Sequence, residues 1–351
     1  MVKENEMEDG AADQRDPESR AGQRQKDSAL LDTAIERFRG RLEHLDWKSA
    51  DPLAAPDLLA ASTAEAITDM CTAAESFEKA AGQDAALIKA AQVAFREKTQ
   101  ALFAKSYFMN RARTWPQGYP GDYLTLEGVY QNSARSKNIG LYLDRYFLST
   151  TLAVAVRARR DKLFELLKSE LQNRKEPRIL DIACGPCHEV LELAPTIKKS
   201  NARITCLDFD SDALTFSENR ISQAGYSSGQ ISFRKYNAVK MISQERNEKE
   251  FGRQDVIYSV GFFDYLSDDV LVRLLRALHH LLNPGGCLIA SFKDSRRYRT
   301  FDYHWLVNWD AFLQRTEEDM WTLFGKADIP VEKITTARDG SGVILFFKAL
   351  Q

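Results

Sequence analysis

From Pro177 onward, short apolar runs alternate with longer stretches whose apolar residues recur every three or four positions. The short runs are typical of buried strands and the longer stretches of helices. Parallel strands need a crossover connection, which a helix of this length supplies. The alternation therefore predicts a doubly wound, mainly parallel α/β sheet of the Rossmann-like kind. The expected strands cover residues 178–184, 202–210, 231–238, 255–263 and 287–292, with a terminal hairpin of 331–337 and 342–349.

One helix of this half is marked by a row of leucines. Residues 268–282 place Leu271, Leu275 and Leu278 on one face, as expected of a helix packed on a sheet. The sequence Asn-Pro-Gly-Gly at 283–286 follows it. Glycine after a helix and proline beyond it predict that the helix ends there.

The first half of the chain has a different pattern. Residues 1–26 are polar and charged, which predicts a disordered tail. Residues 27–175 show helical periodicity and abundant alanine, with a long helix expected from about 140 to 171. We therefore expect a helical N-terminal domain over 27–175, acting as a lid, and a core over 176–351.

Composition excludes several classes of protein. The 351 residues are 44% hydrophobic and 28% charged, with a net charge of −2. This balance gives no reason to expect a nucleic acid or an anionic membrane as partner. The sequence shows neither a bilayer-length apolar run nor a secretory signal, so we predict a cytoplasmic protein with five reduced, mostly buried cysteines.

The loop after the first predicted strand reads ILDIACGPCHE, from Ile179 to Glu189. Its Cys-Gly-Pro-Cys resembles the motif of thioredoxins, but Ala183 stands where they carry tryptophan, and no cis-proline candidate follows at a suitable place. A dinucleotide site needs three glycines, and only Gly185 is present among the three positions. Disulfide exchange and dinucleotide binding are both disfavoured.

S-adenosylmethionine fits this loop better because it carries no phosphate. Its methionine part needs a close backbone turn after the first strand. Its ribose needs a carboxylate at the end of the second strand, since a carboxylate accepts hydrogen bonds from both hydroxyls of a diol. Asp208 occupies that place, and Asn237 after the third strand can meet the adenine amine.

Four segments in order resemble the class I S-adenosylmethionine-dependent methyltransferases: ILDIACGPCHE, CLDFD, YNA and DVIYSVGFFDYL…LLNPGGCLIAS. The resemblance implies a seven-stranded sheet that ends in an antiparallel hairpin, S-adenosylmethionine as cofactor and methyl transfer as activity. Two glycine positions of the family are occupied here by Ala183 and Cys187.

A narrower set of segments, GYPGDYLTLEGVY, SVGFFDYL and WDAFLQRTEEDMWTLF, resembles a bacterial branch labelled as making the methyl ester of 3-hydroxypalmitic acid. This branch resemblance implies a helical N-terminal extension that serves as a lid. Its substrate does not transfer to this chain, because the label covers many divergent sequences.

These observations predict three sets of site residues and no metal site. The cofactor-binding set is Asp181, Ala183, Gly185, Asp208, Phe209, Asn237, Ala238, Ser259, Tyr119 and Asp122. The substrate-binding set is Tyr123, Phe262, Phe263, Tyr265, Tyr303 and Trp305, with Trp309 as a further residue that could close the pocket. The catalytic candidates are His304 and Asp264. Arg296, Arg297 and Arg299 could pair with an anionic substrate or form a solvated basic loop.

The predicted activity is direct transfer of a methyl group to O or N of a small-molecule metabolite, in secondary metabolism, held under the lid. Two alternatives stay open: a methyltransferase acting on RNA or protein, and a cofactor-binding protein without turnover. The long N-terminal helices could also pair two copies into a homodimer.

Overall fold

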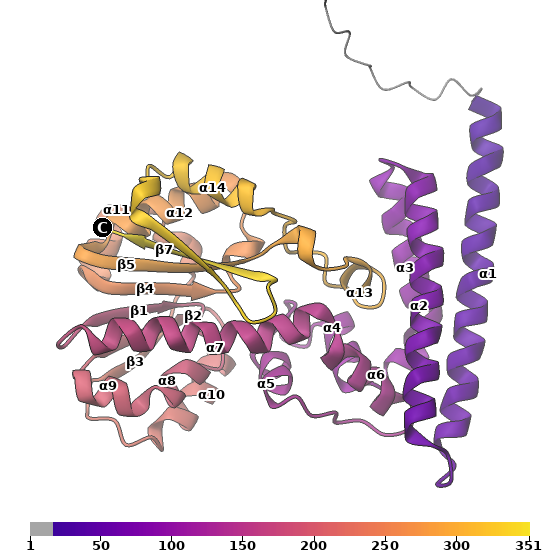
Figure 1. Cartoon of the computed structure of the whole chain (residues 1–351), viewed down its shortest axis with the longest axis horizontal. Helices are drawn as coiled ribbons and strands as arrows, with labels where there is room; N and C mark the ends of the chain where they lie inside the picture. The colour runs from indigo at the N-terminus through magenta and orange to yellow at the C-terminus, as the bar shows by residue number, and fades with distance from the viewer. Residues whose placement is uncertain (1–16) are drawn as a thin grey trace, which may run out of the picture. The chain divides into compact units, whose positions relative to one another are not determined.

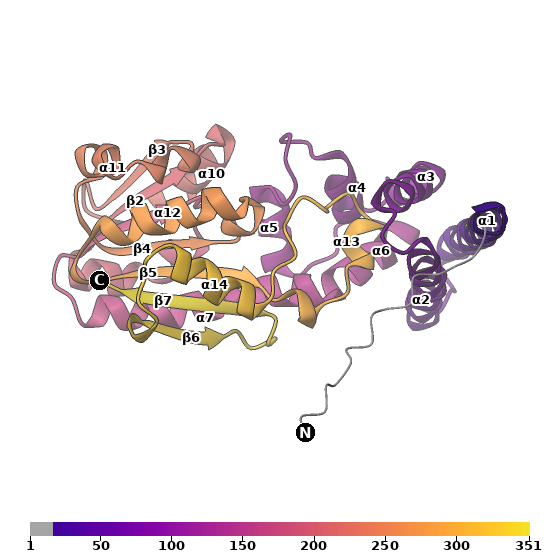
Figure 2. The same ribbon diagram turned by 90° about the horizontal axis from the view of Figure 1, so that it is seen from above.

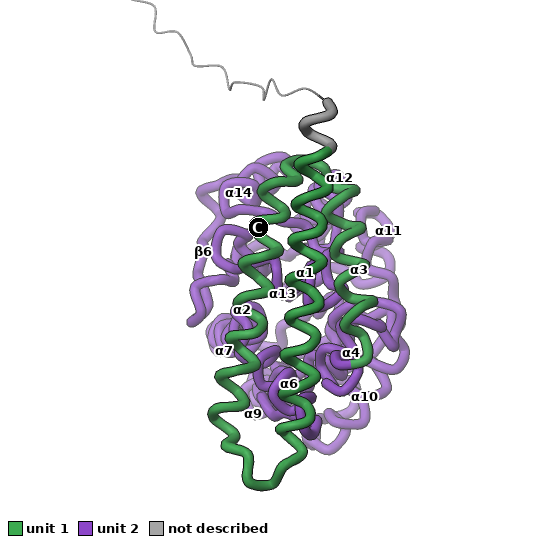
Figure 3. Tube along the Cα trace, turned by 90° about the vertical axis from the view of Figure 1, so that its right-hand side faces the viewer, with its two compact units in different colours: residues 1–101 green, residues 102–351 purple. Residues whose placement is uncertain are grey.

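The computed structural model describes residues 17–351, with side chains from Gly22 onward. The chain forms two compact units, divided between Ala101 and Leu102 and coloured green and purple in Figure 3. Most of the predicted tail lies outside the described residues, and the first helix begins at Pro17, earlier than the expected Asp27. The division into a lid domain at 27–175 and a core at 176–351 stays a prediction.

The first unit is helical. It contains α1 (Pro17–Ser49), α2 (Pro56–Ala81) and most of α3 (Ala85–Phe103). Pro56 stands in the first turn of α2, and Gly82 ends that helix at φ +63°. The rings of Phe38 and Phe95 lie 5.7 Å apart within its core.

The second unit begins with helices that precede the sheet: α4 (Tyr107–Thr114), α5 (Tyr123–Gln131), α6 (Ile139–Ser149) and the longer α7 (Thr151–Gln172). The sequence predicted one helix where α6 and α7 stand, and this prediction is wrong because Thr150 is extended (ψ 150°). Asp144, fully buried in α6, accepts hydrogen bonds from the backbone N–H groups of Arg135 and Ser136 at 2.9 and 3.0 Å. This carboxylate fixes the segment that connects α5 to α6.

The sheet has seven strands in the order β3-β2-β1-β4-β5-β7-β6. The strands are β1 (Arg178–Ile182), β2 (Arg203–Asp208), β3 (Ile231–Lys235), β4 (Gln254–Val260), β5 (Leu282–Lys293), β6 (Ile334–Arg338) and β7 (Ile344–Leu350). The first five are parallel, and β7 runs antiparallel to both β5 and β6. This topology confirms the predicted doubly wound sheet and its terminal hairpin, which Figure 2 shows at one edge.

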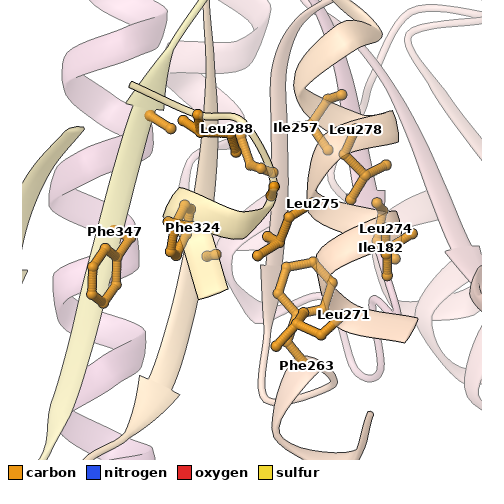
Figure 4. Close-up of a cluster of buried hydrophobic side chains, with 14 of the residues drawn as sticks. Ile182, Ile257, Phe263, Leu271, Leu274, Leu275, Leu278, Leu288, Phe324 and Phe347 are labelled. Carbon is orange, nitrogen blue, oxygen red and sulfur yellow. The ribbon is translucent and has the colours of Figure 1, made fainter. Parts of the chain in front are cut away.

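Helices cover both faces of this sheet (Figure 1). They are α8 (His188–Glu192), α9 (Ala194–Ser200), α10 (Ser211–Ser222), α11 (Gln244–Phe251), α12 (Asp268–His280) and α14 (Glu317–Lys326), besides α7. Helix α13 (Phe301–His304) lies beyond the strand ends, near α4 and α6. Successive strand residues face opposite layers. Ile257 packs with Leu274 of α12, whereas its neighbour Tyr258 packs with Leu163 of α7. Figure 4 shows the first of these clusters.

The predicted end of the leucine-rich helix needs a small correction. Helix α12 ends at His280, and β5 already begins at Leu282. Leu282 pairs with Gln254, and the register then shifts before Cys287 pairs with Val256. The Asn-Pro-Gly-Gly segment is therefore an irregular start of β5 rather than a separate turn.

Among the described residues, the helices are too short or too polar to span a bilayer.

Candidate functional site

A cavity of about 310 Å³ opens in the second unit, where β1, β2 and β4 reach their carboxyl ends. In doubly wound sheets this edge is the usual place for a ligand. Ten of the predicted site residues line it: Tyr119, Tyr123, Ala183, Gly185, Asp208, Phe209, Asn237, Ala238, Phe262 and Tyr265. The lining also includes Pro120, Gly121, Leu126, Arg159, Tyr236, Val260, Gly261, Lys293 and Trp309.

The loop after β1 is tightly held. Its Gly185 donates its backbone N–H to Asp208 at 2.9 Å, and its carbonyl accepts from the Ser217 hydroxyl at 2.7 Å. Ala183 and Cys187 have φ angles of +58° and +47°. Residues with a Cβ seldom adopt this left-handed conformation, which costs on the order of 1 kcal/mol each. The two positions where the family carries glycine therefore keep the conformation that glycine adopts.

Asp208 ends β2 and faces the cavity with 7% of its surface exposed. One carboxylate oxygen accepts the Gly185 N–H, and the other accepts the Asp210 N–H at 3.0 Å. Burial raises the pKa of Asp208, although these two hydrogen bonds act in the opposite direction. Each oxygen keeps a second lone pair, so the carboxylate can still accept from two hydroxyls of one diol.

Asn237 lines the cavity and also begins a short 3₁₀ helix, where its side chain accepts from the Val239 N–H at 3.0 Å. Asn237 can therefore both stabilise the turn and contact an adenine in the cavity. Phe209 has 54% of its surface exposed, which is unusual for a phenylalanine at the end of a buried strand. An exposed ring beside a polar group suits a flat heteroaromatic ligand.

The segment before α5 forms one wall of the cavity. Tyr119 donates its hydroxyl hydrogen to Asp210 at 2.7 Å, and its ring centroid lies 5.1 Å from that of Phe209. Gly121 has φ +73°, and a Cβ placed there would lie 2.5 Å from the Trp309 ring. Glycine is therefore required at this contact.

The opposite wall follows β4. Gly261 has φ +93° and is followed by Phe262. The Trp309 indole N–H donates to the Tyr265 hydroxyl at 2.8 Å, which joins the segment after β5 to the segment after β4. Trp309 thus lies in the cavity wall, as the sequence allowed.

Eight predicted site residues lie outside the walls of this cavity. Asp122 begins α5, accepts from two backbone N–H groups and pairs with Arg111 at 2.6 Å. The Ser259 hydroxyl donates to the Ile182 carbonyl, and Phe263 is fully buried in the sheet core. The remaining five are Asp181, Asp264, Tyr303, His304 and Trp305. The expectation that these side chains line the pocket is therefore wrong.

The two catalytic candidates, Asp264 and His304, are not among the residues that line the cavity. Asp264 is buried and paired with Lys293 at 2.5 Å. His304 ends α13, whose neighbour Tyr303 accepts from the Leu152 N–H at 2.8 Å. A base must reach the proton that it removes. The Asp264 carboxylate is engaged by a cation, so it is poorly suited to that task.

Asp181 is buried behind the loop after β1, with 2% of its surface exposed. Burial raises its pKa strongly, and the nearby Glu189 adds to this effect. Burial also raises the pKa of Glu189 to about 7. This pair of carboxyl groups lines a smaller hollow on the other side of Gly185, so Asp181 does not reach the main cavity directly.

Asp181, Cys184 and Cys187 place one potential metal-ligand atom each within 4.8 Å of the others, so these three residues could hold a metal ion.

Cys184 and Cys187 have 8% and 0% of their surface exposed. A disulfide exchanger needs an accessible thiol. Burial of the Cys-Gly-Pro-Cys segment therefore weighs against the disulfide-exchange alternative.

Glu127 connects α5, which borders the cavity, to the helices α8 and α10 that pack on the sheet. Its carboxylate contacts the His188 ring and the Arg220 guanidinium, each at 2.5 Å, and only 5% of its surface is exposed. Burial by itself would raise the pKa of Glu127, but the hydrogen bonds with His188 and Arg220 outweigh it and lower the pKa to about 2. This cluster positions Leu126, which lines the cavity.

The arginines of the basic loop after β5 are paired with carboxylates of the protein itself. Arg296 pairs with Glu318 at 2.8 Å, Arg297 with Asp294 at 3.3 Å, and Arg299 with Asp302 at 3.2 Å. The alternative that they form an anion site is not supported, because each already has a carboxylate partner.

Residues 179–286 match the family described as a methyltransferase domain. An uncharacterized protein of Rickettsia prowazekii (strain Madrid E) is 28% identical over 131 residues, which make up 37% of this chain and 47% of that protein. The chain thus spans about half the length of the curated relative it matches.

Two solved structures match this chain over different shares of its length. A possible exported protein from Bordetella parapertussis has a TM-score of 0.55 at 16% identity, with 93% of this chain and 96% of that chain covered. Magnesium protoporphyrin IX methyltransferase from Synechocystis PCC 6803, with bound S-adenosylhomocysteine, has a TM-score of 0.44 at 13% identity over 57% of this chain and 85% of that chain.

Proposed function

We infer that this chain, whose residues 179–286 form a class I S-adenosylmethionine-dependent methyltransferase domain, is an enzyme that methylates a small molecule inside the cavity described above. The sequence predicted this family, and the domain match confirms it. Its cofactor is S-adenosylmethionine. The choice between O and N as acceptor, the secondary-metabolic role, the cytoplasmic location and the homodimer all stay predictions.

The observation that carries this proposal is the position of Asp208 beside the loop after β1. The loop presents the backbone of Gly185 to the cavity, and Asp208 presents its carboxylate beside it. A nucleoside with a free ribose diol fits this pair of groups, with Asn237 and Phe209 placed for its base. The residues present therefore suit S-adenosylmethionine.

When bound, S-adenosylmethionine supplies a methyl group already activated on a sulfonium sulfur. The protein then has to align the acceptor with this methyl and exclude water. Phe262, Tyr265 and Trp309 supply aromatic walls after β4 and β5, and Tyr119 covers the cavity near Phe209. Such walls enclose a small molecule better than a polymer, which favours a metabolite over RNA or protein.

Titration calorimetry with S-adenosylhomocysteine tests the cofactor site. Asp208→Ala removes the acceptor of two diol hydrogen bonds, each worth about 1.5 kcal/mol or more with a charged partner, so affinity should fall by about 100-fold. Asp212→Asn is the matched control, because Asp212 lies exposed in the first turn of α10. Equal affinity of wild type and Asp208→Ala would contradict the proposal.

Turnover is tested separately by incubating the protein with methyl-labelled cofactor and a cell extract divided by molecular size. Label should enter the small-molecule fraction. Label found only in protein or RNA would refute the proposed substrate class, and its absence from every fraction would favour a cofactor-binding protein without turnover.

A further inference from the structure

A small hollow of about 40 Å³ lies behind the loop after β1, on the other side of Gly185 from the main cavity. Its lining includes Asp181, Cys184, Cys187 and Glu189. One water needs roughly 10 to 15 Å³ of such space, so the hollow has room for one ion with one or two waters. It is too small for a substrate.

Two carboxyl groups are buried beside this hollow without a cationic partner. Asp181 and Glu189 have 2% and 8% of their surface exposed. Among the residues whose side chains are described, the ion pairs include neither of them. The Tyr258 hydroxyl, a neutral group, donates to Glu189 at 3.0 Å. Burying a carboxylate is costly unless an opposite charge compensates, and a bound cation would supply that charge.

The positive groups at the rim of the hollow already have partners. Arg160 lies 3.1 Å from Asp161 and 3.7 Å from Glu192, and the His188 ring contacts Glu127 at 2.5 Å. These side chains therefore do not neutralise the two buried carboxyl groups.

Two thiols complete a set of three ligand atoms. One oxygen of Asp181 and the sulfurs of Cys184 and Cys187 lie within 4.8 Å of one another, and the Cys187 sulfur is 4.0 Å from Asp181 Oδ2. Zinc lies about 2.3 Å from sulfur and about 2.0 to 2.2 Å from oxygen, so neighbouring ligand atoms of a tetrahedral site are about 3.5 to 3.8 Å apart. The three atoms therefore need to approach by about 1 Å or less to close around one ion.

The strands bring further ligands to the Cys-x-x-C segment. Asp181 of β1 pairs in register with Cys206 of β2, so their side chains leave the same face of the sheet. Cys206 is fully buried in the same cluster as Cys184 and Cys187 and interacts with both thiols. It can therefore supply a fourth ligand. The sequence shows only one pair of cysteines at zinc-like spacing, and the fold adds the rest.

The backbone at Cys187 also supports a role for this thiol. Its φ of +47° is one that residues with a Cβ seldom adopt, and glycine there would remove the strain together with the thiol. A metal bond to the sulfur would offset this strain. It would also hold the loop that presents Gly185 to the main cavity.

We propose that Asp181, Cys184 and Cys187 bind one thiophilic divalent cation of the zinc type, which fixes the loop after β1 from behind. Two thiolates select such metals over magnesium and calcium, which prefer oxygen ligands. Binding releases the thiol protons to solvent. Because the ligands are buried, the site is structural, and it does not depend on the proposed methyl transfer.

The test uses the full chain, which is stripped of metal with a chelator and then refolded from urea under reducing conditions with one added metal. Refolding ensures that burial does not block entry of the ion. Zinc should bind as one ion per chain and raise the melting midpoint, because a ligand of the folded state stabilises it. Cadmium should give the ultraviolet charge-transfer band of a metal thiolate, and magnesium should have neither effect.

Cys187→Gly is the informative variant, because glycine suits the left-handed backbone at this position. Without metal it should be at least as stable as wild type. Its zinc affinity should fall by about 100-fold or more, since changes to groups behind metal ligands already cost about 10- to 100-fold. Cys71→Ser is the control: it removes a buried thiol that lies 3.1 Å from Glu75 in the first unit, and it should leave zinc affinity unchanged.

Three results would overturn the assignment. The first is an absence of bound zinc in wild type that has regained the tryptophan fluorescence of the untreated chain. The second is equal zinc affinity of wild type and Cys187→Gly, which would place the ion elsewhere. The third is release of zinc by saturating S-adenosylhomocysteine, which would assign the hollow to the amino group of the cofactor. Zinc bound as expected by a chain that does not bind S-adenosylhomocysteine would instead refute the proposed function alone.

Discussion

The Glu127 cluster gives a prediction whose size follows from the structure. The pKa of Glu127 falls from 4.5 to about 2, because His188 and Arg220 stabilise the ionised carboxylate more than burial disfavours it. At 1.36 kcal/mol per pKa unit, this corresponds to about 3 kcal/mol of stability at neutral pH. Glu127→Gln should therefore destabilise the second unit by about 3 kcal/mol, or lower its melting midpoint by roughly 6 to 12 °C.

The pH dependence has a definite sign. A carboxyl group whose pKa is depressed in the folded state stabilises the protein above its unfolded pKa, and this contribution is lost as pH falls toward the folded value. The difference between wild type and Glu127→Gln should be largest near neutrality. It should fall to less than half by about pH 3, within the window set by the pKa values 4.5 and about 2.

Tryptophan fluorescence during urea unfolding is the suitable assay, because Trp115, Trp305, Trp309 and Trp321 all lie in the second unit. Glu165→Gln is the control, since it breaks an exposed pair with Lys162 and should cost less than about 1 kcal/mol. Equal destabilisation by the two substitutions at pH 7, or a difference that does not shrink with acidification, would refute the reasoning.

Three further predictions concern the cavity. Burial raises the pKa of Asp208, and a ribose diol binds its ionised form. As pH is lowered, the S-adenosylhomocysteine affinity measured by calorimetry should therefore begin to fall at a higher pH than it would for an ordinary aspartate of pKa about 3.9. An affinity that stays constant down to about pH 3.9 would contradict this. Gly121→Ala places a Cβ 2.5 Å from the Trp309 ring and should weaken cofactor binding by displacing the Tyr119 segment. Gly118→Ala is the control, because its Cβ would meet no atom within 4 Å and it shares only the strain of a positive φ. The control should have the smaller effect on cofactor binding. Ala183→Gly relieves the left-handed strain at φ +58° and should leave the free energy of unfolding in urea unchanged or raise it by about 0.5 kcal/mol. Ala158→Gly in α7 is the control and should lower that free energy by about 1 kcal/mol. Equal losses of stability in the two variants would show that Ala183 is not strained.

The sheet could be predicted from the sequence because its strands and helices differ in period. Residues such as Leu271 and Leu275 recur at helical spacing, and Ile179 to Ile182 form a short apolar run that only Asp181 interrupts. The sequence also located Asp208 and Gly185, since the strand ends of a doubly wound sheet converge. It failed at Thr150, where a single extended residue separates two helical patterns. The only local signal is the run Ser149 to Thr151, whose residue types favour the start of a helix.

The cavity wall was harder to predict because it is built from segments far apart in the chain. Tyr303 and Trp305 looked like pocket residues, but aromatic side chains in a loop can equally pack into the core, as these do. Arg159 was missed although a signal existed. It lies four residues after Ala155 and four before Leu163, on the buried face of α7, where a cation is out of place unless it has a function.

The hydrogen bond from Tyr119 to Asp210 has a kinetic consequence. It joins the segment before α5 to the residue just beyond β2, across the mouth beside Phe209. We expect release of the spent cofactor to require that this hydrogen bond opens. In many enzymes product release rather than chemistry limits turnover. If the same holds here, the turnover rate would be set by the opening of the Tyr119–Asp210 hydrogen bond. Replacing Tyr119 with phenylalanine would then raise the dissociation rate of the nucleoside and lower its affinity.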